Sequence, residues 1–462
     1  MSTTHTSLGV PGDSPRDGEL RSKAPRGPDP ESPGARKSAR RLVAFGLLAT
    51  ALAVLVSAGV EPRGRDASWR TSDIAVSLGS TPAQHAVGPA RPKQLRNAHA
   101  VEKAVGFILS LQPEGSYVLT TPGVDDIVHM DVAHCVIALA KTGHAAEAEA
   151  ATDWLMSKMT LPGDPDRFGS YEHRGLQLPV DYLGSWWDHF RSSGAPRADL
   201  TRGRGEGVGM ALIATYTVYQ ESPDYLLRRL GPHSIADRVA FAASYLTSAA
   251  MQGDDGRFQH RPDYRVSFNE EGARMVLSLR LAAEMLADVG RTAEARQIQM
   301  ASERGLTALL KGEGLSQGMA YDYYALGIWG LVSPRRARQE LVALEAAGLV
   351  TSDGVRNWDW QADRTTGLVD RLRWWAQSQT VAPSQTFDWA IASITAGQIE
   401  NALEVERRWL ALQRPDGGFP DGYLPILGLR FGSPTSYAAA RFIILERLLT
   451  EVFGGDDSLV GL

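Results

Sequence analysis

The stretch from Asn97 to Phe453 alternates six times between two kinds of predicted helix. Each helix of the first kind is followed by a more apolar one, and a largely apolar helix is typical of a buried position. The first kind begins near Asn97, His144, Ser234, Thr292, Pro334 and Glu400, and the second near Asp125, Arg204, Phe268, Ala320, Ser384 and Pro434. Six such pairs predict an all-α domain whose hairpins close into a ring, with the more apolar helices as the inner layer.

Four of the outer helices end in related sequences. These are FILSLQPEGSY (107–117), WLMSKMTLPGDPDRF (154–168), YLTSAAMQGDDGRF (245–258) and WLALQRPDGGF (409–419). Each has an aromatic residue and a Leu, often a Gln, then an acidic turn with Gly and a second aromatic residue. A turn of this kind is typical of a helix end, with the aromatic side chain folding back onto the helix. The repeat indicates units that are stacked or arranged in a circle.

These repeats resemble those of the α/α-toroid proteins. Two groups share the pattern: the six-hairpin glycosidase-like enzymes and the terpenoid cyclase/prenyltransferase group. The segment RGRGEGVGMALIATYTVYQESPDYLLRRL (202–230) is similar to the Gly-Glu-Gly or Gly-Glu-Ala inner helix of six-hairpin hydrolases and sugar epimerases. The resemblance covers 97–453, and it implies an (α/α)6 toroid whose chemistry lies where the inner helices begin.

The decisive motifs of the terpenoid group are incomplete in this chain. Those cyclases carry Asp-x-Asp-Asp, whereas this chain has Val124-Asp125-Asp126. Zinc-dependent prenyltransferases carry Asp-x-Cys, and the nearest match, Asp131 and Cys135, has the wrong spacing. We therefore expect no metal site and no cofactor, and the terpenoid relationship stays the more distant alternative.

The N-terminal part of the chain has a different composition. Residues 1–41 are polar and rich in Pro and Gly, which predicts a disordered tail. Residues 42–60 are apolar, uncharged and about long enough to span a bilayer. Basic residues before them predict a signal anchor with a cytoplasmic N-terminus, a flexible tether over 61–95 and an extracytoplasmic toroid over 96–462. Cleavage near Ala58, which would give a secreted protein, is the alternative.

Charge and cysteine content exclude several classes of protein. The formal net charge is -5, which gives no electrostatic basis for binding nucleic acid. Cys135 is the only cysteine, so an internal disulfide and a multi-cysteine zinc site are excluded. It lies in an apolar helix, where we expect a buried thiol.

Acidic residues gather where the inner helices are predicted to begin, and these ends converge in a toroid. Asp126 and Glu206 are the preferred catalytic pair, and Glu206 lies between glycines, where the backbone can approach a ligand closely. The reserves are Glu271, Asp322 and Asp388. Glycoside hydrolysis needs one protonated and one ionised carboxyl group.

Aromatic and basic residues at the same ends suit a sugar, since flat rings cover its apolar face and polar groups bind its hydroxyls. The predicted binding residues are His129, Arg204, Trp187, Tyr323, Trp389 and Tyr437.

The leading hypothesis is a membrane-tethered carbohydrate-active enzyme, a glycoside hydrolase acting on a polysaccharide or oligosaccharide. The alternatives are a terpenoid cyclase/prenyltransferase-like toroid and a non-catalytic glycan-binding or scaffold protein.

Overall fold

The computed structural model describes residues 95–113, 116–173, 176–197, 201–264, 266–312, 320–356, 379–425 and 428–453. All of them belong to one compact unit, Ile74–Leu462. The predicted tail (1–41), apolar segment (42–60) and all but the last residue of the predicted tether lie outside the described residues. Within the described part, no helix combines the length and apolarity that a membrane span requires.

The helices of this unit form six consecutive pairs, as the alternation predicts. The outer helices are α2 (Ala98–Ser110), α4 (Ala145–Ser157), α6 (Ile235–Leu246), α8 (Thr292–Lys311), α10 (Pro334–Ala346) and α13 (Ile399–Leu410). The inner elements are α3 (His129–Lys141), α5 (Gly205–Glu221), α7 (Asn269–Asp288), η3 (Ala320–Tyr323) with α9 (Ala325–Ile328), α12 (Pro383–Thr395) and α14 (Ser436–Val452). A short 3-10 helix, η2 (Pro223–Leu227), follows α5.

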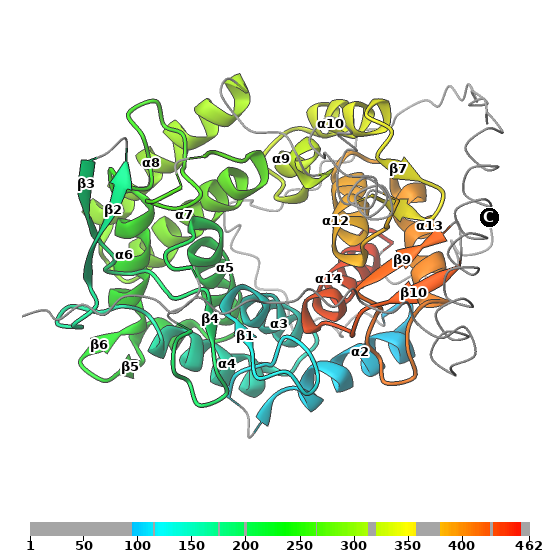
Figure 1. The fold of residues 1–462 in the computed structure, drawn as a ribbon, viewed down its shortest axis with the longest axis horizontal. Coiled ribbons are helices and arrows are strands. Elements are labelled where there is room, and N and C mark those ends of the chain that lie inside the picture. Colours follow the sequence, from blue (N-terminus) through cyan, green and yellow to red (C-terminus); the bar gives the residue numbers. More distant parts are fainter. Residues whose placement is uncertain are drawn as a thin grey trace, which may run out of the picture. The chain divides into compact units, whose positions relative to one another are not determined.

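The inner elements close into a ring (Figure 1). In chain order, α3 packs on α5, α5 on α7, α7 on α9, α9 on α12 and α12 on α14. The ring is completed because α14 packs back on α3. The predicted (α/α)6 toroid is therefore confirmed.

The fourth inner element is much shorter than the sequence pattern predicts. It begins at Ala320 but consists of only two short helical pieces, η3 and α9. Gly330 follows soon afterwards with a φ of 61°, a left-handed conformation that ends a helix. Pro334 then starts α10, so no room is left for a full-length inner helix.

The predicted all-α class is confirmed, and the described residues add five two-stranded antiparallel ribbons in the connections between helices, which the sequence analysis did not predict. They pair β1 (Ile127–Val128) with β4 (His189–Phe190), β2 (Phe168–His173) with β3 (Leu176–Asp181), β5 (Arg229–Leu230) with β6 (His233–Ser234), β7 (Val350–Thr351) with β8 (Gly354–Val355), and β9 (Gly422–Leu424) with β10 (Leu429–Phe431). Most are two or three residues long, which is too short to show a pattern of alternating polarity. The β1–β4 pairing joins the loops that precede α3 and α5, with Ile127 opposite Phe190.

The Gln of the repeated sequence links neighbouring outer helices. After α2, the Gln112 side chain donates hydrogen bonds to the carbonyls of Ser116 in its own turn and of Glu147 in α4. After α6, the Gln252 side chain likewise donates hydrogen bonds to the carbonyl of Gly256 in its own turn and to that of Ala301 in α8. The repeat therefore closes its own turn and also attaches that turn to the next outer helix.

The last repeat applies this link to the two ends of the ring. Gln413, after α13, donates to the carbonyl of Ala100 in α2 at 2.9 Å and to that of Gly417 at 3.1 Å. Gly417 has a φ of 92°, and a Cβ atom there would lie 1.9 Å from the carbonyl oxygen of Lys103 in α2. Only glycine fits this turn, because it must adopt a positive φ and approach α2 closely.

The repeat without Gln uses an arginine instead. In 154–168 the Gln position is replaced, and Arg238 of the next outer helix donates to the carbonyl of Met156 at the end of α4, at 2.7 Å. The guanidinium is 3% exposed, so this bond forms in the interior. Here the later helix donates to the earlier one, but the bond still joins two consecutive outer helices, α4 and α6.

Most aromatic residues of the repeats are core residues, as predicted, but the prediction is wrong for Phe168, which is 71% exposed. Trp409 and Phe419 of the last repeat are fully buried, and both contact Phe387 of α12, with ring centroids 5.5 and 5.3 Å away. Phe442 of α14 packs on the same group at 4.9 Å from Phe419. These contacts connect the outer turn to two inner helices.

We predict that Gln413→Leu lowers the free energy of unfolding by about 1–3 kcal/mol, because two hydrogen bonds that join the first and last hairpins are lost. Chemical denaturation of the full chain measures this. Gln299→Leu is the control, since Gln299 bonds only Glu303 on its own helix, and we expect it to stay within about 0.5 kcal/mol. Equal effects of the two substitutions would contradict a ring-closing role.

Candidate functional site

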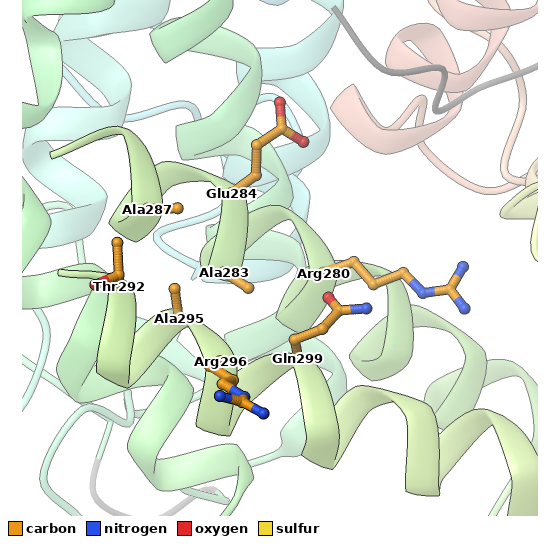
Figure 2. A pocket seen from close by; sticks show the side chains of 8 residues that line it. All are labelled: Arg280, Ala283, Glu284, Ala287, Thr292, Ala295, Arg296 and Gln299. Atoms are coloured by element: carbon orange, nitrogen blue, oxygen red, sulfur yellow. The ribbon is translucent and has the colours of Figure 1, made fainter. Parts of the chain in front are cut away.

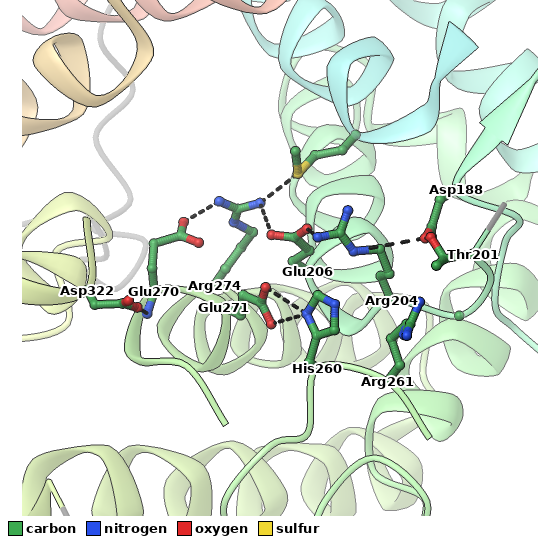
Figure 3. Close-up of polar contacts among 12 residues, drawn as sticks. Asp188, Thr201, Arg204, Glu206, His260, Arg261, Glu270, Glu271, Arg274 and Asp322 are labelled. Atoms are coloured by element: carbon green, nitrogen blue, oxygen red, sulfur yellow. Dashed lines mark hydrogen bonds and ion pairs between the residues drawn. The ribbon is translucent and has the colours of Figure 1, made fainter. Parts of the chain in front are cut away.

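Glu206 and Glu271 lie in the first turns of two neighbouring inner helices, α5 and α7 (Figure 3). Glu206 is 8% exposed to solvent, and Glu271 is 6% exposed. Carboxyl groups are rarely buried to this extent without partners, so their surroundings decide their charge.

The glycines on either side of Glu206 allow inner helices to pack closely. A Cβ atom at Gly205 would lie 2.4 Å from the Met275 sulfur of α7, and one at Gly207 would lie 1.9 Å from Nε2 of His129 in α3. The sequence predicts a close approach of this backbone to a ligand, whereas in the structure side chains of α7 and α3 lie against the two glycines.

Glu206 is held between two guanidinium groups. Arg204 lies 2.7 Å from one of its carboxylate oxygens, and Arg274 lies 3.6 Å from the other. Burial alone would raise the pKa of Glu206, but the two positive charges outweigh it and lower the pKa below its ordinary value. Glu206 is therefore ionised at neutral pH.

Glu271 has the opposite surroundings. Both of its oxygens lie 2.8 Å from Nδ1 of His260, and the described residues give it no ion pair with an arginine. Burial and then the negative charge of Glu206 raise its pKa well above the ordinary value. Burial lowers the pKa of His260 to about 4, so the imidazole is neutral at neutral pH. The pKa of Glu271 is therefore shifted in the opposite direction to that of Glu206.

Arg274 contacts several members of this cluster. It forms an ion pair with Glu270 one helical turn before it and reaches Glu206 on the neighbouring helix. Its guanidinium lies 5.4 Å from the ring centroid of Trp329, and the Trp329 indole N–H donates to Glu270 at 3.4 Å. Arg274 therefore connects α5, α7 and the short fourth inner element.

Asp126, the preferred partner of Glu206 in the sequence analysis, has other partners in the structure. It lies in the loop before β1, where His189 approaches its carboxylate to 3.0 Å and Arg197 to 3.5 Å. These contacts fix the loop that carries β4 to the loop that carries β1. The described contacts do not join Asp126 to Glu206.

The two remaining candidates are engaged in packing. Asp388 of α12 forms a buried ion pair with Arg441 of α14, and the guanidinium of Arg441 lies 5.6 Å from the ring centroid of Trp329. Asp322 of η3 accepts a hydrogen bond from the backbone N–H of Glu270 at 3.4 Å. Both carboxylates therefore tie inner elements together.

The predicted binding residues differ in what they offer. His129 is 2% exposed, with Nδ1 3.1 Å from the carbonyl oxygen of Asp188, and burial lowers its pKa. Trp389 is buried, Tyr437 packs edge-on against His134, and Tyr323 is half-buried. Arg204 is more open, since its side chain is 31% exposed.

Sequence reasoning did not select His260, Arg274 or Asp188. His260 lies in an irregular loop, and only its place two residues after the repeat aromatic Phe258 could have drawn attention to it. Arg274 follows Glu270 by one helical turn, a spacing that puts both on one face and was a usable signal. Asp188 is 1% exposed, accepts a hydrogen bond from Thr201 and lies 3.9 Å from Arg204.

Asp131 and Cys135 lie deeper, on α3. Burial raises the pKa of Asp131 to about 7. Cys135 is fully buried, as predicted, and burial raises the pKa of its thiol. In the described part of the chain, no three acidic, histidine or cysteine side chains are grouped in a way that could hold a metal ion.

Two pockets are formed by described residues. One, of about 600 Å³, lies between α7 and α8 and has a floor of alanines with Glu284 at its side (Figure 2). Glu284 is the only carboxyl group that lines it and accepts a bond from Tyr216, so this pocket lacks a pair for acid–base chemistry. The other, of about 470 Å³, is lined by Tyr182, Trp187, His189, Thr201, Arg202, Arg261 and Asp263, close to the mouth of the ring.

Solved structures with a similar arrangement are glycosidases. A glycosidase variant in complex with glucose matches with a TM-score of 0.55 and 14% identity over 77% of this chain and 96% of that one. A bacterial glucoamylase complexed with acarbose matches with a TM-score of 0.55 and 12% identity over 77% and 57%. A family 63 mannosylglycerate hydrolase from Thermus thermophilus, in complex with glucose, matches at 0.50 and 12% over 75% and 99%. At this identity the likeness establishes the fold, that of the six-hairpin glycosidase-like α/α toroids.

Comparisons of the sequence itself give no relatives. No family model matches the chain, and no curated protein matches it significantly.

We predict that Asp388→Ala destabilises the protein by about 3–5 kcal/mol, because Arg441 is left buried without its partner. The double variant Asp388→Leu, Arg441→Met should recover most of this loss, since it removes both charges. Thermal and denaturant unfolding of both variants measures it. A folded Asp388→Ala protein of unchanged stability would contradict the structural role of this pair.

Proposed function

We propose that the protein is a glycoside hydrolase in which Glu271 is the general acid and Glu206 its ionised partner. The observation that carries the proposal is the opposite surroundings of two buried carboxyl groups on adjacent inner helices: two arginines lie beside Glu206, and a histidine lies beside Glu271. These surroundings lower the pKa of Glu206 and, with burial, raise that of Glu271. A hydrolase that cleaves a glycosidic bond needs this combination.

Each group would act through the proton that it holds or lacks. Glu271 would donate its proton to the glycosidic oxygen, so that the leaving sugar departs as a neutral alcohol. Glu206 would either take a proton from the attacking water or attack the anomeric carbon itself. The two routes invert or retain the configuration of that carbon, and the anomeric form of the first product distinguishes them.

His260 would act as a positioning residue for Glu271. Its Nδ1 contacts both oxygens of the carboxyl group, and its backbone carbonyl accepts a bond from the N–H of Gly205 at 3.1 Å. The loop of His260 is thereby attached to the start of α5, next to Glu206. One imidazole thus fixes the orientation of the acid relative to its partner.

A glucose-type sugar is the first substrate to test. Two of the similar structures hold glucose, and a third holds acarbose, by their own descriptions. The cluster at the starts of α5 and α7 offers charged hydrogen-bonding groups, which suit hydroxyls better than the apolar chain of an isoprenoid. No observation therefore favours the terpenoid alternative. A glycan-binding protein without activity would show binding but no turnover.

We predict that Glu271→Gln lowers kcat by about 10²–10⁴-fold on gluco-oligosaccharides, because the leaving oxygen is no longer protonated. The loss should be smaller for glucosyl fluoride, whose leaving group needs less assistance from an acid. Glu284→Gln, on the same helix but remote from the cluster, is the control and should retain activity. Full activity of Glu271→Gln would sink the assignment of the acid.

Hydrolysis should have a bell-shaped dependence on pH. Glu271 acts while protonated, so activity is lost as the pH rises through its raised pKa. Glu206 acts while ionised, so activity is lost as the pH falls through its lowered pKa. Arg204→Gln removes a positive charge next to Glu206, which raises the pKa of that carboxyl and moves the acidic limb to higher pH. An acidic limb that stays in place would show that another group controls it.

A further inference from the structure

The pocket of about 470 Å³ next to the cluster has the size of a small-ligand site. It is lined by Tyr182, Trp187, His189, Thr201 and Arg202, which precede α5, and by Arg261 and Asp263, which follow the repeat of the third hairpin. The lining residue Thr201 donates to Asp188, which lies beside Arg204, the partner of Glu206. Figure 3 shows Thr201 and Asp188 on one side of Arg204 and Glu206 on the other.

The charges that line this pocket are balanced by neighbours. Arg261 lies 3.0 Å from Asp263, which also lines the pocket. Arg202 lies 3.5 Å from Asp166 and donates to Thr160. His189 contacts Asp126. The pocket therefore presents directional donors and acceptors without an unbalanced positive or negative charge.

Two aromatic rings give the pocket a firm apolar surface. The guanidinium of Arg202 lies 4.4 Å from the ring centroid of Tyr182 and 4.9 Å from that of Trp187. The Trp187 indole N–H donates to Asp166 at 3.0 Å, which fixes the orientation of the ring. Half-buried aromatic rings beside paired polar groups are suited to a pyranose unit, which has apolar faces and a rim of hydroxyls.

We propose that this pocket is a subsite for a second, uncharged sugar unit of the substrate. The proposal rests on the proposed function, in that it places the reacting bond at Glu206 and Glu271, and it goes beyond it by assigning the neighbouring unit and its chemistry. The substrate is then at least a disaccharide. Trp187 and Arg261 determine the preference for chain length, and the balanced charges disfavour an acidic sugar at this position.

Binding to an inactive protein tests the subsite without requiring turnover. The full chain with Glu271→Gln is titrated calorimetrically with glucose, with maltotriose, isomaltotriose and cellotriose, and with a glucuronic-acid-containing trisaccharide. We expect at least one neutral trisaccharide to bind more tightly than glucose. Addition of Trp187→Ala should weaken binding of that trisaccharide about tenfold or more, with a much smaller effect on glucose.

Two further variants keep the test decisive. Arg261→Gln removes one hydrogen-bonding group without deleting a packed ring, and it should weaken binding of the same trisaccharide several-fold if Trp187→Ala fails to fold. Tyr219→Ala, at the opposite end of α5 and bonded to Asp288, is the control and should leave trisaccharide binding as it was. A loss of equal size for glucose and trisaccharide would overturn the subsite.

The remaining outcomes of the titrations decide between the subsite and the hydrolase proposals. Tighter binding of the acidic trisaccharide than of every neutral one, or no preference for any trisaccharide over glucose, would overturn the proposal. Trisaccharide binding that depends on Trp187, in a wild-type protein that hydrolyses no glycan, would support the subsite and reject the hydrolase. The two proposals can therefore fail separately.

Discussion

Hydrogen bonds that join one outer helix to the next constrain the ring, and the repeat glutamines form three of these links while Arg238 forms a fourth. A helix hairpin buries only part of its apolar surface, and six hairpins give a closed core only if each is fixed at a defined angle to the next. Gln112 and Gln252 set this relation within the chain, and Gln413 applies it between the last hairpin and α2. Closure then brings the start of every inner element to one mouth.

Close packing of the inner helices explains why the mouth is chemically unusual. Gly205 and Gly207 let α5 lie directly against α7 and α3, so the residue between them has little contact with water. A carboxylate in such a place is costly unless cations approach it. The arginines that stabilise ionised Glu206 come from its own loop and from α7, so this stabilisation depends on the packing of α5 against α7.

The sequence predicts the order of the elements better than their details. Helix periodicity and the repeats locate all six hairpins because these signals extend over many residues, and the Gly-Glu-Gly motif draws attention to Glu206. Ribbons of two or three residues are too short to give a sequence pattern. The same is true of the short helix α9. The partners of Asp126 could not be predicted from sequence, since His189 and Arg197 lie in a distant loop.

Charge balance at the starts of α5 and α7 acts on the pKa of Glu271 in the same direction as burial. The starts of α5 and α7 bury three carboxyl groups, Glu206, Glu270 and Glu271, against the guanidiniums of Arg204 and Arg274. Arg274 contacts both Glu206 and Glu270, and Arg204 contacts Glu206, so Glu271 is the acid that faces a neutral imidazole. A third buried negative charge would have no cation to offset it. The shortage of cations therefore acts together with burial, and both favour the neutral form of Glu271 by raising its pKa.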